Sequence, residues 1–265
     1  KFGDAYDLYI SGQTQRALYA VESWYSWHSR EDYANNIRSI RNSYFGSLDG
    51  SVSPNSLSAL IAAGDPALDS QVKAAIEEAS DAILAIPQPF RNNINSAEAR
   101  AAMSACADLE EIFSVSLHAA IQKLAADPNL QNVVDNYVDN VVVPTYSDLA
   151  LKNEKLYQTV LAFREKPSDD AFAAACQAWL VAREPWECSE AFLFGPVDAL
   201  GLDPNMDSWP LDQDAIVQIL NSGNYDDLDW SDSDDDDRIE AVQSVRGFHT
   251  LEFLLFKDGQ PRKIN

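Results

Sequence analysis

Residues 69–86 read DSQVKAAIEEASDAILAI, and this stretch decides the fold class. Its apolar side chains recur at spacings of three and four and form one stripe, made of Val72, Ile76, Ala79, Ile83 and Ile86. This spacing is typical of an amphipathic α-helix that buries one face. Pro87 and Pro89 end the helix, because a proline nitrogen cannot donate a hydrogen bond and the preceding residue is pushed out of the helical region.

The same periodicity recurs along most of the chain and predicts an all-α protein of antiparallel, bundle-like helices. Asp127-Pro128 is interpreted as a helix N-cap followed by proline in the first turn, and the loop from Gly195 to Asp212 as a structured excursion with a function. We expect two packed helical-bundle domains, 1–124 and 125–265. Further helices are expected over residues 96–124, 130–163 with a bend at Pro144, 169–184 with Ser168 or Asp169 as cap, and 238–256.

Charge and composition exclude several classes of function. The 265 residues include 19 Lys and Arg but 42 Asp and Glu, which gives a formal net charge of −23. Such a surface repels nucleic-acid phosphates and anionic lipid headgroups. The sequence has no run of 18 apolar residues, so we expect no membrane span, and we expect any signal peptide to be absent from this chain. The three cysteines lack CxxC spacing and are interpreted as small buried residues, at least one of them unpaired.

An acidic tract over residues 226–237 holds eight aspartates. Calcium prefers such oxygen ligands, but the tract lacks the glycine and the closing glutamate of a twelve-residue calcium loop. A solvated start of a helix, where carboxylates meet the positive end of the helix dipole, is therefore favoured over a cation site.

Three polar clusters interrupt otherwise apolar helices. In the first, RGFHTLEF over residues 246–253, His249 and Glu252 are three residues apart on one helical face, with Arg246 one turn earlier and Gly247 inside the helix. Imidazole and carboxylate at this spacing can share a metal ion, or His can act as a base that Glu orients. A satisfied buried histidine remains the alternative, and the His-Glu-x-x-His spacing of zinc proteases is absent.

The second cluster lies between residues 179 and 196, where Arg183, Glu187 and Glu190 share one face among aromatic residues. The third lies between residues 22 and 38. Its candidates for buried polar contacts are Asp32, Asn36 and Arg38.

Together these clusters resemble the imelysin family, the insulin-cleaving and iron-regulated proteins of bacterial cell envelopes. The resemblance rests on Gly-x-His-x-x-Glu at 247–252, on REPWECSEAFLFGP at 183–196 and on ESWYS at 22–26. In the family the Gly-x-His-x-x-Glu half comes first, so the two halves here are in reversed order. The family often has histidine directly after the Tyr-Ser pair. This chain has Trp27 there and His28 one place later, a rotation of about 100° on a helix, so no ligand role is expected of His28.

The resemblance implies two helical bundles with a shared polar site at their junction. It nominates His249 and Glu252 as the core of that site and Glu190 as a third metal ligand. Ligand-binding residues are then expected at Arg183, Glu187, Ser189, Glu190, Arg246, Ser23, Tyr25, Ser29 and Asp32.

Three functions follow as alternatives. The first is an extracytoplasmic protein of iron uptake, periplasmic or a lipoprotein of the outer membrane, which works with envelope iron-transport components and binds a metal ion, an iron complex or a small ligand in the inter-domain cleft. The second is a metallopeptidase in which His249 and Glu252 are catalytic and hold a divalent metal or iron. The third is a non-catalytic interaction module. The exposure of His249 to solvent distinguishes them, because a fully enclosed imidazole favours the third.

Overall fold

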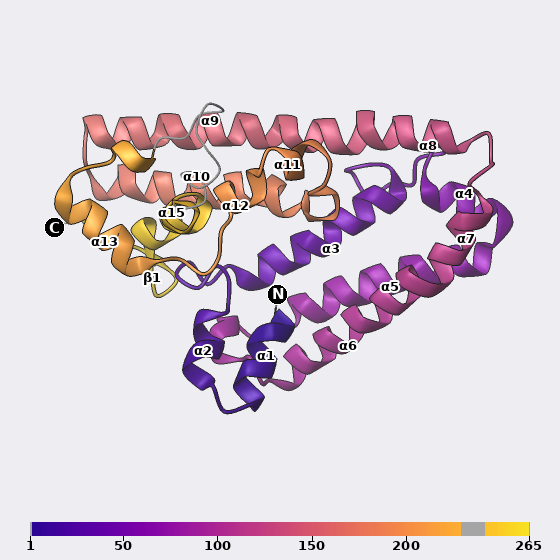
Figure 1. Ribbon diagram of the computed structural model, residues 1–265, viewed down its shortest axis with the longest axis horizontal. Helices are drawn as coiled ribbons and strands as arrows, with labels where there is room; N and C mark the ends of the chain where they lie inside the picture. The colour runs from indigo at the N-terminus through magenta and orange to yellow at the C-terminus, as the bar shows by residue number, and fades with distance from the viewer. Residues whose placement is uncertain (1, 229–241, 265) are drawn as a thin grey trace.

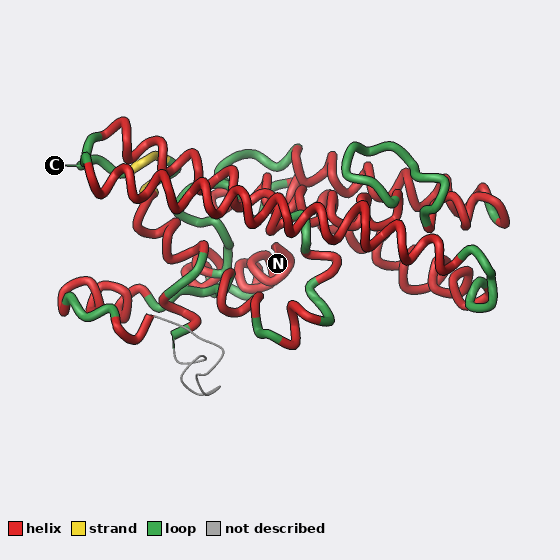
Figure 2. The backbone as a smooth tube through the Cα atoms, turned by 90° about the horizontal axis from the view of Figure 1, so that it is seen from above, coloured by secondary structure: helices red, strands yellow, loops and turns green. Residues whose placement is uncertain are grey.

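The computed structural model describes residues 2–228 and 242–264. Its helices confirm the all-α prediction, and the two strands in the described residues form one short hairpin near the C-terminal end (Figure 2). The helices of the first half are α1 (Phe2–Ile10), α2 (Thr14–Tyr19), α3 (Ser29–Phe45), α4 (Leu57–Gly64), α5 (Pro66–Leu84), α6 (Ala97–Glu111) and α7 (His118–Lys123). Those of the second half are α8 (Leu130–Tyr137), α9 (Val143–Glu165), α10 (Asp169–Glu187), α11 (Pro196–Ala199), α12 (Leu202–Met206), α13 (Gln213–Ser222) and α15 (Phe248–Leu255). Strands β1 (Phe256–Lys257) and β2 (Gln260–Pro261) follow.

Two hydrophobic clusters form the core. The first joins α1 to α7 around the stripe of α5, with Ile76 and Ile83 almost fully buried. The second joins α9, α10, α12 and α15 around the buried ring of Trp179 and also contains Tyr25 from the first half. Helix α3 contacts both α5 and α10, so it lies where the two clusters meet (Figure 1). We refer to the parts of the chain around each cluster as lobe 1 and lobe 2. The proposed domain boundary near residue 124 stays a prediction.

Several helices begin with the expected capping chemistry. Ser96 and Ser168 accept hydrogen bonds from Ala99 and Ala171, and they cap α6 and α10. Helix α8, the π-helical segment Val138–Val142 and α9 continue into one another along one edge of the molecule (Figure 1). Pro144 lies in the first turn of α9, directly after the π-helical segment. Near the position of the predicted bend, the chain therefore changes from π-helix to α-helix.

Two predicted helix starts differ from the structure in detail. Helix α8 begins at Leu130 as expected, but its N-cap is Asn129, and Asp127 Oδ1 instead accepts a hydrogen bond from the Asn129 N–H at 2.8 Å. The predicted C-terminal helix is not continuous over its described part, residues 242–256. Helix α15 begins at Phe248, after Gly247 with φ 90° and a 3₁₀ turn at Gln243–Val245. Most of the acidic tract, and with it the predicted solvated helix start, lies outside the described residues.

Two further expectations concern the cysteines and the membrane. Cys106, Cys176 and Cys188 are all free thiols, and the last two are buried as predicted. Among the described residues, no helix combines the length and the apolar character that a bilayer span requires.

Candidate functional site

The backbone at Gly247 fixes where α15 begins. A Cβ atom at this position would lie 2.4 Å from the carbonyl oxygen of Met206, and φ is +90°, so only glycine fits. Arg246 is extended rather than helical and bonds to Asn205 Oδ1, so the expected placement of Arg246 on the helical face of His249 is wrong. The close approach that Gly247 permits brings α15 against the end of α12.

His249 is fully buried where the two lobes meet. Its Nδ1 lies 3.0 Å from Glu252 Oε2, and its Nε2 lies 3.2 Å from Asp207 Oδ1. Arg183 Nη2 is 3.3 Å from the same Nε2, and the ring of Trp209 covers the imidazole at a centroid distance of 4.7 Å. Both ring nitrogens therefore already have protein partners.

Glu252 joins lobe 2 to the loop before α3 through hydrogen bonds. Its Oε1 accepts hydrogen bonds from the backbone N–H of Tyr25 at 3.0 Å, the N–H of Ser26 at 2.8 Å and the Ser26 hydroxyl at 2.7 Å. Because the other oxygen bonds to His249, this fully buried carboxylate is satisfied on both sides. The motif that the sequence suggested as a metal or catalytic pair thus holds two distant segments together.

Arg183 is the central charge of the same network. Its guanidinium bonds to Asp207, lies 2.6 Å from Glu187 Oε1 and is 3.5 Å from Asp32 Oδ2. Burial alone would lower the pKa of Arg183, but the charges of Asp207, Glu187 and Asp32 outweigh it and raise the pKa well above its usual value. One buried guanidinium therefore holds carboxylates from α3, α10 and the loop after α12. We call Arg183, Asp32, Glu187, Asp207, His249 and Glu252 the inter-lobe network.

Asp32 extends the network toward the surface. Its Oδ2 accepts a hydrogen bond from the Ser23 hydroxyl, and its Oδ1 lies 2.9 Å from His28 Nδ1. Burial would raise the pKa of Asp32, but the His28 hydrogen bond and the charge of Arg183 outweigh it and hold that pKa well below the usual range. The same bond to Asp32 raises the pKa of His28, against the opposing effect of burial.

The remaining predicted site residues lie around this network rather than in it. The hydroxyls of Ser189 and Ser29 bond to the carbonyls of Trp186 and Glu22, at 2.7 and 2.6 Å, and serve local turns. Tyr25 is buried in the lobe 2 cluster, and burial raises its pKa. Glu190 lines a separate cavity of about 300 Å³, together with Glu22, Asp203, Asp207 and Trp209.

The expected metal set of His249, Glu252 and Glu190 does not fit this geometry. A cation at His249 Nε2 would lie beside the Arg183 guanidinium, and like charges that close are strongly unfavourable in a buried site. The Glu252 oxygens already accept four hydrogen bonds from protein groups. In the part of the chain that the structure describes, no cluster of three or more His, Cys, Asp or Glu side chains is arranged to hold a metal ion. The predicted metal role therefore stays a prediction without geometric support.

Sequence reasoning missed Asp207 and the contact between His28 and Asp32. Asp207 lies in the loop over residues 195–212, which was predicted to be structured and to have a function. No spacing pattern in the sequence connects Asp207 to His249. Asn36, a candidate for buried contacts, does make them, because its Nδ2 lies 2.6 Å from Glu187 Oε2. Arg38 instead bonds to Glu184 in a solvent-accessible groove.

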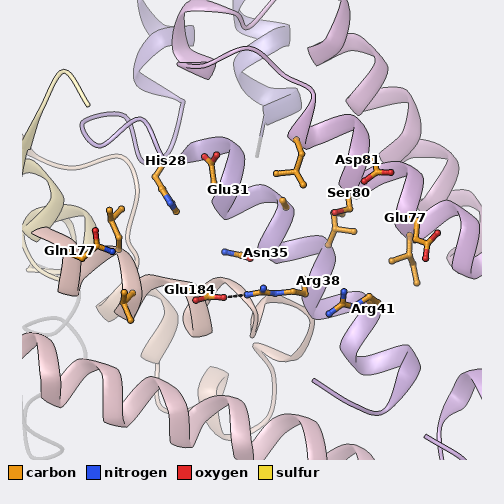
Figure 3. A pocket seen from close by; sticks show the side chains of 16 residues that line it. His28, Glu31, Asn35, Arg38, Arg41, Glu77, Ser80, Asp81, Gln177 and Glu184 are labelled. Carbon is orange, nitrogen blue, oxygen red and sulfur yellow. Dashed lines mark hydrogen bonds and ion pairs between the residues drawn. The ribbon is translucent and has the colours of Figure 1, made fainter. Parts of the chain in front are cut away.

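This groove lies at the junction of the lobes. Its volume is about 710 Å³, and it lies over α3 with α5 on one side and α10 on the other (Figure 3). Ala34, Ile37, Leu180 and Val181 are among its apolar lining residues. His28 lines the groove, and its Nδ1 lies 2.9 Å from Asp32 Oδ1. The buried network and the open groove are thus neighbours that share the Asp32–His28 pair.

The fold and the network define an all-helical protein whose two lobes are joined by buried charges. The imelysin family model matches residues 4–115 and 142–264. The chain therefore belongs to the imelysin family, a group classed as peptidase family M75.

Three relatives place the chain among known proteins. It is similar to the crystal structure of an imelysin peptidase from Bacteroides ovatus, with 59% identity, a TM-score of 0.94, and coverage of 100% of this chain and 76% of that one. It is 34% identical over 156 residues to iron-regulated protein A of Synechococcus elongatus, which is 59% of this chain but only 38% of that protein. An iron-regulated protein A precursor from Parabacteroides distasonis matches 48% of this chain at 42% identity, with a TM-score of 0.44. This chain therefore spans less than half the length of its curated relative.

Proposed function

We propose that this protein acts outside the cytoplasm in bacterial iron acquisition and binds an iron complex or another small ligand in the groove between its lobes. The iron-related name of the Synechococcus elongatus relative supports the biological role. The groove itself is the observation that carries the binding role. Its volume of about 710 Å³ is in the range of small-molecule sites, and apolar side chains of α3, α5 and α10 line it together with polar and charged ones.

The ligand belongs in the groove rather than at His249. The imidazole of His249 is fully buried and both of its nitrogens are engaged, so a ligand could reach it only by displacing Asp207 or Arg183. Separating those charges leaves buried carboxylates without their counter-charge, which costs several kcal/mol. The groove requires no such rearrangement. The full enclosure of His249 favours the third alternative, a non-catalytic joining role, for the motif itself. We therefore assign the inter-lobe network to joining the lobes and the groove to binding.

Calorimetric titration of the full chain with iron(III) chelates and with free metal ions tests this role. Val181, on α10, lines the groove, so Val181→Trp should fill part of it and weaken binding at least tenfold. Leu151→Trp places the same ring on the exposed face of α9 and serves as the matched control. Equal binding by both variants contradicts the assignment to the groove.

Location outside the cytoplasm and partnership with envelope iron-transport components are part of the same proposal. Fractionation of cells that produce the natural protein should place it in the periplasm or the outer membrane. Recovery in the cytoplasmic fraction would contradict this part of the proposal.

A metallopeptidase is the second candidate, and it is favoured by the family's classification and by the name of the Bacteroides ovatus structure. Such a reaction requires a metal-activated water molecule. Cleavage of reduced insulin that is sensitive to chelators and is lost in a folded Glu252→Gln variant would support it. Cleavage that persists in that variant contradicts a catalytic role for Glu252, and no cleavage at all by the wild type contradicts the peptidase function.

A further inference from the structure

His28 is held in one orientation by groups that are themselves fixed. Its Nδ1 lies 2.9 Å from Asp32 Oδ1, and the fully buried Asp32 is anchored by Ser23 and by Arg183 from the opposite lobe. The His28 side chain keeps 27% of its surface exposed and lines the groove. Because one nitrogen is tied to Asp32, the other nitrogen, Nε2, is the one available to a ligand (Figure 3).

Two amide side chains line the same part of the groove. Asn35 comes from α3, two turns after His28, and Gln177 comes from α10 across the groove (Figure 3). Within the described residues, neither of these side chains has a hydrogen-bond partner, nor does His28 Nε2. Amide and imidazole groups that line a hollow are able to orient a polar ligand group.

Four carboxylates also line the groove, but the two on α3 and α10 are paired with cations, whereas Glu77 and Asp81 belong to α5. On α3, Glu31 Oε1 lies 2.6 Å from Arg30 Nη2. Arg38 lies next to Asn35 along α3, and its guanidinium bonds to Glu184. Lys152 lies 3.7 Å from the same carboxylate. Glu184 is therefore already paired with two cations, whereas His28 and the two amides remain available to accept an anion from solution.

We propose that the ligand of the groove carries a carboxylate, which is bound by His28 Nε2 and by the amide groups of Asn35 and Gln177. This inference rests on the proposed function, because it names the chemistry of the ligand that the groove accepts. Carboxylate-rich chelators are natural ligands of iron, since iron(III) is a hard cation that prefers oxygen donors. A carboxylate-bearing iron complex therefore satisfies both the proposed role and the donors of the groove.

Binding should weaken as the pH rises. His28 donates a charge-assisted hydrogen bond only while it is protonated. Asp32 and Glu31 from α3 and Arg183 from α10 act on His28 directly. The other charged groups of the groove are Arg38 and Arg41 from α3, Glu184 from α10, and Glu77 and Asp81 from α5. The Asp32 bond raises the pKa of His28 and extends the protonated range upward. Citrate affinity should therefore be higher at pH 6 than at pH 9.

Isothermal titration of the full chain with citrate, succinate and benzoate, against glycerol as a neutral probe, tests the inference. His28→Gln keeps an amide donor but removes the charge, and it should weaken carboxylate binding at pH 6 about tenfold and abolish the pH dependence. His118→Gln is the matched control, because His118 is exposed on α7 and outside the groove. This control should bind as the wild type does.

Asn35→Asp is a second variant that does not depend on His28. It places a negative charge beside the ligand carboxylate and should also reduce affinity at least tenfold, whereas Asn221→Asp on the exposed surface of α13 should not. Unchanged binding in both His28→Gln and Asn35→Asp overturns the inference.

The outcomes separate this inference from the proposed function. If no carboxylate binds but an uncharged or cationic iron complex does, and Val181→Trp blocks it, the carboxylate inference is wrong and the groove assignment stands. If no probe binds, or if Val181→Trp and Leu151→Trp bind alike, both proposals are wrong.

Discussion

Replacing Arg183 with methionine should destabilise the protein more than any other single substitution in the inter-lobe network. The change keeps most of the side-chain volume but removes a fully buried charge that faces Asp207, Glu187 and Asp32. Removing one partner of a buried ion pair typically costs about 3–5 kcal/mol, because the other charge stays buried without compensation. For a chain of this size the loss corresponds to roughly 6–20 °C in Tm.

The pH dependence of this loss identifies its cause. Without Arg183 the buried carboxylates take up protons more readily, so the variant should recover stability as the pH falls from 7 to 5. In the wild type, the lowered pKa of Asp32 means that its contribution is present above the unfolded-state pKa of about 3.9 and is lost only at lower pH. The difference in unfolding free energy should therefore be larger at pH 7 than at pH 5.

Urea denaturation followed by circular dichroism at both pH values measures this difference. Arg100→Met is the matched control, because Arg100 is exposed on α6 and contacts only Asn95 in the described structure, so it should change stability by less than about 0.5 kcal/mol. A loss below about 1 kcal/mol for Arg183→Met, or an equal loss at both pH values, would refute the view that one guanidinium balances three buried carboxylates.

Three further predictions concern the same region. Gly247→Ala should cost about 2 kcal/mol or more in thermal or urea unfolding, because its Cβ meets the Met206 carbonyl at positive φ, whereas Gly3→Ala, in open space, should be neutral or slightly stabilising. Glu252→Gln should cost about 2–3 kcal/mol, since it weakens charge-assisted bonds that join the lobes; a neutral result in urea titration contradicts the joining role. His28→Gln should be less stable than the wild type at pH 6 and should approach the wild type at pH 9. The folded-state pKa of His28 is raised, so its contribution to stability is complete below the unfolded-state pKa of about 6.5 and is lost as the pH rises through the folded-state pKa. A difference in unfolding free energy that does not change with pH refutes this.

Four of the five helical ranges predicted from local signals match helices of the described structure, α5 to α10, whereas α1 to α4 and α11 to α13 were not predicted. The 69–86 pattern corresponds to α5. This helix begins at Pro66 after its cap Asp65, and it ends at Leu84, three residues before Pro87. Ser96 and Ser168 cap their helices because a serine hydroxyl accepts a bond from a backbone N–H three residues on. Such information lies within a few neighbouring residues, so the sequence alone reveals it.

The errors arise where tertiary contacts override local preference. The 246–253 segment has helical periodicity, yet the chain must approach Met206 at Gly247, and this interrupts any helix before Phe248. Asp207 could not be assigned to the site because its partners, Arg183 and His249, come from other elements that only the fold brings together.

The polar motifs show the same limit for function. Their spacing correctly indicated that His249 and Glu252 act together, but spacing cannot reveal whether solvent reaches them. In the structure Glu252 accepts backbone hydrogen bonds from Tyr25 and Ser26, a contact between residues more than 220 positions apart. The contact between His28 and Asp32 was not predicted, because the position of His28 was compared only with a family pattern. That contact links His28 to the inter-lobe network.

A crystal of the protein soaked with iron(III) citrate tests the central claim most directly. Anomalous diffraction at the iron edge would locate the metal, and the electron density would locate the chelator. We predict iron in the groove between α3 and α10, with a citrate carboxylate at His28 Nε2 and the Arg183–Asp207–His249 contacts unchanged. Iron bound at His249, with Arg183 or Asp207 displaced, would contradict the account.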